Sequence, residues 1–309
     1  MTYYDGGTNL LPAHYLQALD ESFYGLDAEE AAFYKQQTGI QDDAELKQHI
    51  MAVQAKAYSV FPYPCIRRFA FTQLKISRLF AYRGFLNLGK TRKSPIFLDI
   101  GCCFGNDIRK AVADGYPAEC VIGSDLQKDF WNLGHELFRT TPETFPVPFV
   151  GGDAFNPEHL AVVPPFTPAN QPTTPPPDLK SLTSLNPLRG HVSAIHASSF
   201  FHLFREDSQL HLARALAGLL SPEPGSMIFG SHASLPEKGL RVIRKDGDDK
   251  RSMFCHSPES WTELWDGVIF EKGEVKVEAT LKLLQRPNIL LGEDAAQTAH
   301  IMSYCITRL

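Results

Sequence analysis

The sequence predicts an α/β fold in which short apolar strands alternate with helices around a nucleotide-binding turn. The first observation is an apolar segment, 96–100, that runs into a turn of the pattern D-x-G-x-x-x-G. The second is that two later apolar segments each end in an acidic residue, Asp125 and Asp153. The third is a further apolar strand, 192–195, that is followed by a segment with helical periodicity. This alternation is typical of α/β proteins with a parallel sheet.

The N-terminal part, residues 1–92, is predicted to be mainly helical and separate from the α/β part, 93–309. The expected helices cover 15–24, 28–36, 42–58 and 71–80. Within 42–58, one face is marked by the apolar positions Leu46, Ile50 and Val53. Two prolines interrupt the pattern within 61–69, where we expect an extended turn.

The turn after residue 100 has the residues that a ligand-binding loop needs. Gly101 and Gly105 let the backbone approach a ligand closely, and Cys103 lies between them. The helix expected from about Asn106 would present its N-terminal amides to the same ligand. A lone glycine-rich turn is weak evidence for a nucleotide-binding site, so the interpretation depends on the segments that follow it.

Acidic residues follow the next two strands. Asp125 ends the apolar segment 121–124, twenty residues after Gly105, and its carboxylate could accept both hydroxyls of a ribose. Asp153 follows the apolar segment 147–150 in the same way. An acid after a strand is often only a helix cap or a turn former. Three acids in this order indicate a shared ligand more strongly than any one of them does.

The remaining elements continue the alternation. The expected elements are strand 192–195, a helix with apolar residues from Leu210 to Leu220, strand 226–230, helix 258–265 and closing strands 275–284 and 300–307. Ser257 is the expected cap of the helix that begins with Pro258. The insert 156–190 holds nine of the 22 prolines and is predicted to be a loop outside the core, either a lid or disordered.

The order and spacing of these segments resemble the class I S-adenosylmethionine (SAM) methyltransferases. The resemblance covers roughly 95–309 and implies a doubly wound, seven-stranded sheet whose last strand is antiparallel. It also implies that Asp99 orients the methionine end of SAM, Asp125 holds the ribose, Asp153 meets the adenine amino group and Leu126 packs on the adenine. The full set of expected cofactor-binding residues is Asp99, Gly101, Cys103, Gly105, Asp125, Leu126, Asp153, Ala154 and His196. The usual pattern has glycine where this chain has Cys103.

Three segments, 61–67, 196–204 and 224–230, together resemble a narrower group, the fungal methyltransferases of secondary-metabolite pathways. These include enzymes that methylate a carboxyl group of farnesylated aromatic acids during meroterpenoid synthesis. The resemblance implies that the N-terminal helices form a cap over a pocket for a hydrophobic small-molecule acceptor. The expected acceptor-binding residues are Tyr63, Arg67, Phe200 and Trp261. Packing within the cap, for Tyr63, and ion pairing, for Arg67, are alternative explanations for these residues.

The chemistry implied by this resemblance is transfer of the SAM methyl group, which leaves S-adenosylhomocysteine. The enzyme must mainly align an acceptor lone pair and exclude water. A phenol or alcohol acceptor would need a base, for which His202, His196 and His191 are candidates, whereas a carboxylic acid is already ionised near neutral pH. His202 could also be a packed, hydrogen-bonded histidine. O-methylation of a carboxyl group is favoured slightly over a hydroxyl group. N- or C-methylation, and a SAM-fold binding protein without catalysis, remain open.

Composition narrows the class of protein further. An apolar fraction of 43% is ordinary for a globular protein, and a net charge of −5 gives no general attraction for nucleic acid. No apolar stretch is long enough to span a bilayer, and the first residues show no signal pattern, so a cytoplasmic location is expected.

The six cysteines lack metal-ligand spacing, so we expect reduced thiols and no metal. The oligomeric state is left open.

Overall fold

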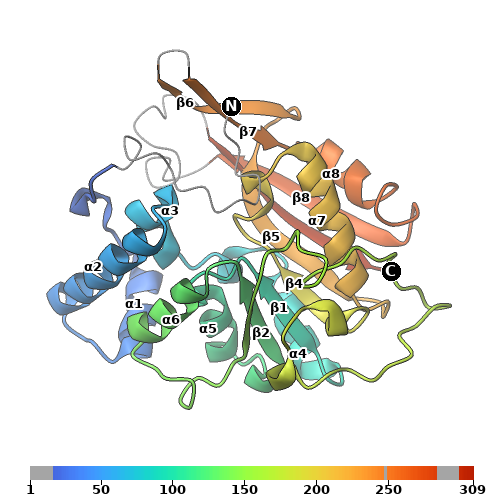
Figure 1. Ribbon diagram of the computed structural model, residues 1–309, viewed down its shortest axis with the longest axis horizontal. Coiled ribbons are helices and arrows are strands. Elements are labelled where there is room, and N and C mark those ends of the chain that lie inside the picture. The colour runs from blue at the N-terminus through green and yellow to red at the C-terminus, as the bar shows by residue number, and fades with distance from the viewer. Residues whose placement is uncertain (1–16, 247–248, 284–298) are drawn as a thin grey trace.

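The computed structural model describes residues 17–246, 249–283 and 299–309 (Figure 1). Within these residues, one mixed sheet has the strand order β3-β2-β1-β4-β5-β9-β8, and a separate hairpin pairs β6 with β7. The strands of the sheet are β1 (Ile96–Ile100), β2 (Val121–Asp125), β3 (Phe149–Gly151), β4 (Val192–His196), β5 (Met227–Ser234), β8 (Val275–Leu283) and β9 (His300–Arg308). The hairpin strands are β6 (Gly239–Asp246) and β7 (Asp249–Cys255).

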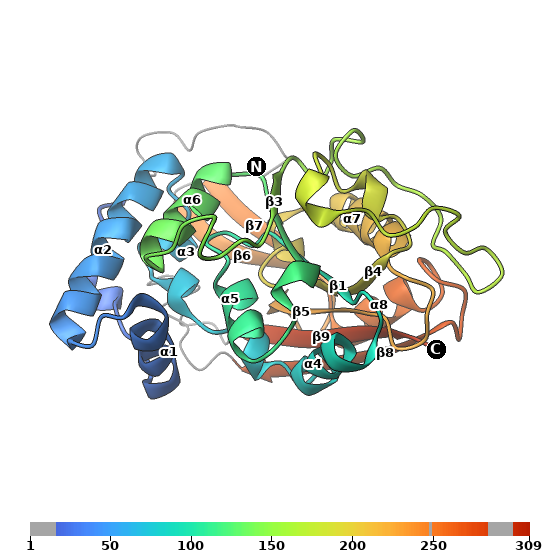
Figure 2. The ribbon, with the colours of Figure 1, turned by 90° about the horizontal axis from the view of Figure 1, so that it is seen from below.

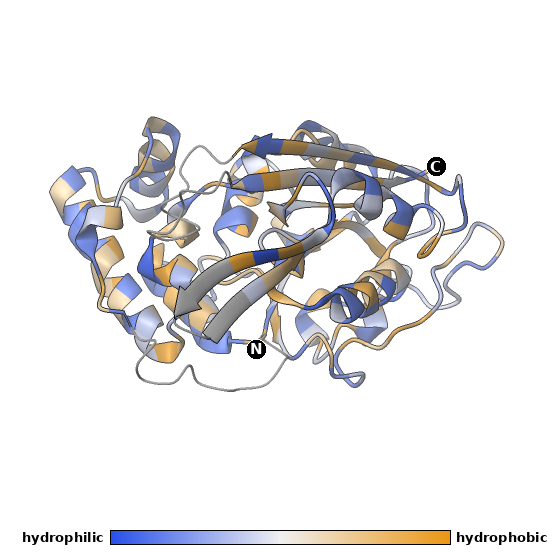
Figure 3. Ribbon diagram, turned by 90° about the horizontal axis from the view of Figure 1, so that it is seen from above, coloured by the Kyte–Doolittle hydropathy of each residue, from blue (hydrophilic) through white to orange (hydrophobic). Residues whose placement is uncertain are grey.

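The sheet confirms the predicted architecture. Strands β1 to β5 are parallel, and β9 runs antiparallel between β5 and β8. Every residue of β1 and β4 is buried, as expected for central strands that are covered on both faces. The edge strand β8 instead alternates between more and less exposed residues, and its hydropathy alternates with them (Figure 3).

Helices cover both faces of the sheet (Figure 2). The helices are α1 (Ala28–Thr38), α2 (Asp43–Val60), α3 (Pro64–Arg67), α4 (Tyr82–Thr91), α5 (Asn106–Ala113), α6 (Lys128–Leu137), α7 (Glu206–Leu219) and α8 (Pro258–Trp265). Phe97 packs in one apolar cluster with residues of α4, α5 and α6, whereas Ile96 and Leu98 pack in a second with residues of α7 and α8. Successive side chains of β1 therefore supply opposite layers of the core.

The N-terminal cap contains the predicted helices α1 and α2. Asp27 and Asp42 cap them, and Leu46, Ile50 and Val53 are buried on the predicted face of α2. The cap shares an apolar cluster with Phe104, Phe130, Leu137 and Phe138 of the α/β part. The cap and the α/β part are therefore joined by a continuous hydrophobic interface.

Three predictions in the cap are corrected. Of the expected helix 15–24, residues 15–16 lie outside the described residues, and the rest forms only a short 3-10 helix, η2 (Glu21–Phe23). The expected helix 71–80 is replaced by two 3-10 helices, η3 (Ala70–Thr72) and η4 (Ile76–Arg78), before α4. Within 61–69, the chain is extended only as far as Tyr63, after which α3 begins at Pro64.

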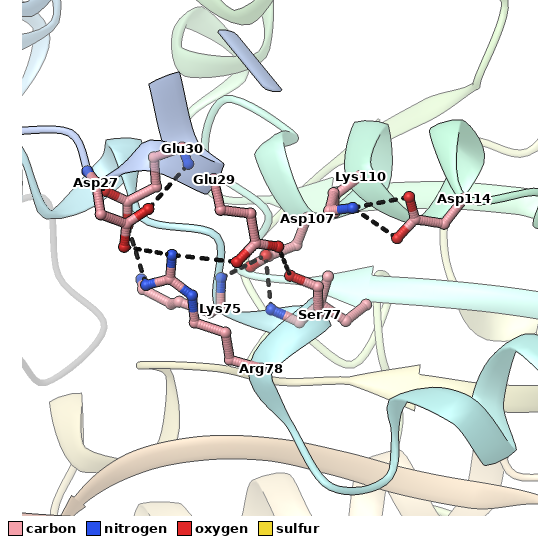
Figure 4. A network of polar contacts seen from close by, with 10 residues as sticks. Asp27, Glu29, Glu30, Lys75, Ser77, Arg78, Asp107, Lys110 and Asp114 are labelled. Atoms are coloured by element: carbon pink, nitrogen blue, oxygen red, sulfur yellow. Dashed lines mark hydrogen bonds and ion pairs between the residues drawn. The ribbon is translucent and has the colours of Figure 1, made fainter. Parts of the chain in front are cut away.

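The break in helix 71–80 has a tertiary cause, shown in Figure 4. The carboxylate of Asp107, in the first turn of α5, accepts hydrogen bonds from the backbone N–H groups of Lys75 (3.1 Å) and Ile76 (2.9 Å). Arg78 pairs with Asp27 and with the fully buried Glu30 of α1. These contacts use backbone groups and side chains that a continuous helix would direct elsewhere.

The proline-rich insert 156–190 is an ordered connection between β3 and β4. Its leucines Leu160, Leu179, Leu185 and Leu188 are buried in the same cluster as α7, so the prediction that the insert lies outside the core is wrong. The burial explains how a segment without a long helix stays ordered, because it contributes apolar surface to the core.

The middle of the insert lies at the amino edge of the parallel strands. There the Phe166 carbonyl accepts a hydrogen bond from Arg308 at the end of antiparallel β9 (3.0 Å), and Gly190 N–H donates to Gly218 of α7 (3.1 Å). The predicted acids lie at the opposite, carboxyl edge. A lid over the predicted ligand site would have to lie at that carboxyl edge, so the position of the middle of the insert does not favour the lid alternative.

The hairpin β6–β7 was not predicted. It follows the carboxyl end of β5 directly, and β7 contacts the 3-10 helix η8 (Phe201–Leu203) that follows β4. The hairpin therefore lies beside the carboxyl edge of the sheet (Figure 1). Among the described residues, no helix combines the length and apolarity needed to cross a bilayer.

Candidate active site

The carboxyl edge of the sheet brings the predicted acids together. Asp99 of β1 lies opposite His196 of β4 in the sheet register. Asp125 of β2 lies opposite Gly151 of β3, and Gly151 is followed two residues later by Asp153. Parallel strands end at the same edge, so the three carboxylates and His196 lie along one edge of the sheet. The charge of Asp99 is close enough to contribute to the raised pKa of Asp125, for which burial is the larger cause.

The turn after β1 has three residues with left-handed backbone angles: Gly101 (φ 72°), Cys103 (φ 51°) and Gly105 (φ 72°). A Cβ atom on Gly101 would lie 2.8 Å from the Phe200 ring, and one on Gly105 would lie 2.7 Å from the Trp131 ring. Both glycines therefore serve close packing as well as the turn. The angle at Cys103 explains why glycine is usual there, because this conformation is unfavourable for residues with a Cβ atom.

Asp125 fastens this turn to β2. One carboxylate oxygen accepts the N–H of Cys103 (2.9 Å), and the other accepts the N–H of Gln127 (3.0 Å). Each oxygen has a second lone pair, so the carboxylate can still accept hydrogen bonds from a diol. Leu126 follows directly and is partly buried. Asp153 accepts the N–H of Phe155 (2.9 Å) in the turn that contains Ala154.

Asp99 and His196 form the buried end of a hydrogen-bonded chain. His196 Nδ1 lies 2.8 Å from the Asp99 carboxylate, and its Nε2 lies 2.7 Å from the Ser198 hydroxyl. Ser198 accepts the N–H of Ser231 (3.1 Å), so its own proton is available to His196 Nε2. Burial lowers the pKa of His196. The charge of the Asp99 carboxylate and its hydrogen bond together raise this pKa by more than burial lowers it, so the net shift is upward. Both imidazole nitrogens are therefore hydrogen-bonded within the protein: Ser198 orients the His196 ring, and the ring in turn holds Asp99.

His202 lies in η8 and is partly buried. Its Nδ1 accepts the N–H of Ala233 on β5 (3.3 Å). Burial, together with the positive charges of Lys75 and Arg241, lowers the pKa of His202 to about 4. The imidazole is therefore neutral at neutral pH, and with Nδ1 acting as an acceptor its proton lies on Nε2. In this state His202 can donate a hydrogen bond but has no free nitrogen lone pair to serve as a base.

Two of the predicted acceptor-binding residues lie in the cap. The ring of Tyr63 lies 4.2 Å from Phe61 and 5.9 Å from Phe130, measured between ring centroids. Arg67 donates to the carbonyl of Ala18 (2.8 Å) and lies over the ring of Phe23. The guanidinium of Arg67 is therefore occupied by the segment before α1.

The other two lie beside η8. Phe200 is buried against Gly101, at the turn after β1. Trp261 is fully buried, with ring centroids of His232 and Tyr304 at 4.7 and 4.9 Å. Its indole N–H has no hydrogen-bond partner within the described part of the chain. A binding role for each of the four residues remains a prediction.

Sequence reasoning did not select several residues that the structure brings to this region. Lys75 of the cap and Arg241 of β6 act on His202, and His232 and His256 lie close to Trp261. These residues come from segments that are distant in sequence and match no motif. Of these residues, only Arg241 could have been noticed in the sequence, because it belongs to a short basic cluster in an otherwise apolar segment. Among the described residues, no group of three His, Cys, Asp or Glu side chains could hold a metal ion.

Comparisons with known proteins show that the chain is similar to several fungal enzymes. The family model of the meroterpenoid methyltransferase N-terminal domain matches residues 20–72. The asnovolin E/chermesin D methyltransferase nvfJ of Aspergillus novofumigatus is 33% identical over 229 residues, covering 74% of this chain and 72% of that protein. The methyltransferase ausD of Penicillium brasilianum is 27% identical over 261 residues, covering 84% and 82%. The O-methyltransferase phiE of a fungal species is 33% identical over 225 residues, covering 72% and 65%.

Solved structures show only distant similarity. The 1,6-didemethyltoxoflavin N1-methyltransferase of Burkholderia thailandensis has a TM-score of 0.45 and 14% identity, covering 84% of this chain and 89% of that one. A similarity of this size carries no functional argument.

Proposed function

The chain belongs to the family of fungal meroterpenoid methyltransferases, and we propose that it transfers a methyl group from SAM to a carboxylate oxygen of a hydrophobic small molecule. The relative phiE is an O-methyltransferase, which supports oxygen as the acceptor atom. The protonation state of His202 supports a carboxylate over a hydroxyl group.

The residues at the carboxyl edge fit SAM by their chemistry. Asp125 would hold the ribose hydroxyls with the lone pairs that remain after its two backbone contacts. Asp99, fixed by His196, would orient the methionine end, and Asp153 with Leu126 would meet the adenine. When bound, SAM supplies an electrophilic methyl group on a positively charged sulfur. The buried carboxylates of Asp99 and Asp125 suit a cationic ligand, because neither forms an ion pair with Lys or Arg within the described residues.

The observation that carries the choice of acceptor is the hydrogen bond from Ala233 N–H to His202 Nδ1. It leaves His202 as a donor, so the histidine we predicted as a general base is unsuited to remove a proton. A phenol or alcohol needs such a base, whereas a carboxylic acid is ionised at neutral pH without one. The protein then has to orient the carboxylate and exclude water.

The test is product analysis with isotopically labelled SAM. We would offer the purified protein a farnesylated benzoic acid together with the matching phenol and the matching amine, and identify the methylated product by mass spectrometry. Mild alkaline hydrolysis separates the outcomes, because it cleaves a methyl ester and leaves a methyl ether or N-methyl group intact. We expect an alkali-labile product from the acid alone. An alkali-stable product as the main product would overturn the carboxylate assignment.

A further inference from the structure

Arg241 of β6 is a buried cation without a complete set of partners. It is 7% exposed, and its Nη1 has no hydrogen-bond partner among the residues that the structure describes. Within the described residues, no carboxylate forms an ion pair with it. A guanidinium carries five N–H donors and stays charged, so burying it without an acceptor is unfavourable. Such a residue is typical of a site that an anion completes.

The position of Arg241 directs this charge toward the active site. Arg241 pairs in register with Met253 of β7, and β7 contacts η8, which carries His202. The guanidinium charge lowers the pKa of His202, after the larger effect of burial. It also acts on Cys255 at the end of β7, whose pKa is raised to about 11 mainly by burial. The hairpin thus brings a cation to the histidine that follows β4.

Lys75 brings a second positive charge to the same place from the cap. Its charge acts on the pKa values of Asp99, His196 and His202, although burial is the larger cause in each case. The backbone of Lys75 is held by Asp107, at the start of α5 (Figure 4). Within the described ranges, no side-chain oxygen accepts a hydrogen bond from the Lys75 ammonium group. The Lys75 charge is therefore within electrostatic range of two predicted cofactor residues, Asp99 and His196, and of His202.

We infer that Arg241, Lys75 and the Nε2–H of His202 together bind the carboxylate of the acceptor. This inference rests on the proposed function and names the recognition site within it. Arginine can hold a carboxylate with two parallel hydrogen bonds, lysine adds a compact positive charge, and the neutral histidine adds one more donor. The three come from the hairpin, the cap and η8, so the site exists only in the folded chain.

The neighbouring histidines do not compete for these cations, and Asp99, the carboxylate that the Lys75 charge reaches, is already held by His196. The other histidines near His202 are His232 and His256, and burial lowers the pKa of both, that of His256 to about 4. Both are neutral at neutral pH and bring no negative charge. Methylation would convert the bound anion to a neutral ester, which loses its attraction to Arg241 and Lys75. The site would thus favour the acid substrate over the ester product.

The experiment measures binding of a farnesylated benzoic acid and of its primary amide to the protein saturated with S-adenosylhomocysteine. We would compare the parent with Arg241→Gln and Lys75→Gln, and use Arg83→Gln as the control because Arg83 is an exposed residue of α4. For the parent and the control, the acid should bind on the order of tenfold more tightly than the amide. In Arg241→Gln the preference should fall below about threefold, with a smaller loss in Lys75→Gln. S-adenosylhomocysteine affinity should be unchanged in Arg241→Gln.

Three outcomes would overturn the inference: no preference for the acid in the parent, a preference that survives in a folded Arg241→Gln protein, or an equal loss in the Arg83→Gln control. Arg241→Met provides a second readout, since removing a buried, unpartnered charge should leave the unfolding temperature unchanged or raise it. A large fall would show that Arg241 is structural. Failure of the proposed function is distinguishable. If the main product is alkali-stable while the acid preference still depends on Arg241, the anion site stands and the reaction assignment does not.

Discussion

At the scale of single residues, the chemistry open to the candidate site depends on which side-chain atoms already form hydrogen bonds within the protein. Asp125 uses both carboxylate oxygens on backbone N–H groups, His196 uses both ring nitrogens, and His202 uses one. The sequence identified each of these residues as a candidate, but hydrogen-bond partners decide what each can still do. Asp125 can accept from a diol, His196 can only hold Asp99, and His202 can only donate.

Asp125→Ala should weaken SAM binding by about 1 to 3 kcal/mol, because it removes a buried acceptor and also releases the Cys103 N–H in the turn. Isothermal titration calorimetry with SAM measures the change. Asp129→Ala, at an exposed acid on α6, is the matched control and should bind SAM like the parent. Unchanged affinity in a folded Asp125→Ala protein would refute the ribose role.

His202→Gln and His202→Ala separate a donor from a base. Glutamine retains an N–H donor, so we expect it to preserve kcat and most of the acceptor affinity, whereas alanine should raise KM for the acid by about tenfold. Steady-state kinetics with the acid acceptor provides both parameters. A loss of about a hundredfold or more in kcat in both variants would instead support a general base.

At the scale of elements, the short 3-10 helices η3 and η4 matter more than the helix that the sequence pattern predicted. The apolar residues of 71–80 are mostly buried, as their pattern required, but they reach the core without a continuous helix. Asp107 holds the backbone at Lys75 and Ile76, and this contact places Lys75 near the active site. A contact between α5 and the cap thereby sets the position of a candidate binding residue.

Asp107→Ala should lower the free energy of unfolding by about 1 to 3 kcal/mol, because two backbone N–H groups lose their acceptor. It should also raise KM for the acid acceptor through the displacement of Lys75, with little change in kcat. Urea unfolding and steady-state kinetics measure the two effects.

Asp114→Ala is the control at the opposite end of the same helix, where Asp114 pairs with Lys110 (Figure 4) and accepts a hydrogen bond from the Tyr82 hydroxyl. It should affect stability but leave the acceptor KM unchanged. If both variants raise KM equally, the placement of Lys75 does not depend on Asp107.

At the scale of the whole molecule, burial of histidines links stability to pH. His256 is buried in an aromatic cluster, and burial lowers its pKa to about 4 from an ordinary value near 6.5. A depressed histidine pKa means that the unfolded chain binds a proton more readily than the folded one between these values. Stability is therefore lost as the pH falls from about 6.5 toward 4, and is fully present above that range.

The expected contribution of His256 is a loss of about 2 kcal/mol between pH 7 and 5. We would measure urea unfolding of the parent and of His256→Asn at both pH values. The difference between the two proteins isolates this histidine from the buried carboxylates, whose raised pKa values act in the opposite direction. A difference that stays constant between the two pH values would show that His256 does not carry this effect.

The sequence by itself determined the positions of the sheet strands along the chain, the glycine turn and the three acids. The reason is local: strands, turns and the residues at strand ends are set by neighbours within a few positions, and parallel strands bring their carboxyl ends to one edge. Helices α1 and α2, with their aspartate caps, follow from the same kind of local pattern.

Only the tertiary structure decided the state and the partners of the site residues. The break at 71–80, the hairpin β6–β7, the buried leucines of 156–190 and the proton position on His202 all depend on groups distant in sequence. Burial and hydrogen bonds between distant segments fix pKa values and free lone pairs, and no local pattern encodes them. The proposed convergence of Arg241, Lys75 and His202 is of this kind, because three separate elements must pack together before two charges and one neutral donor can bind one acceptor.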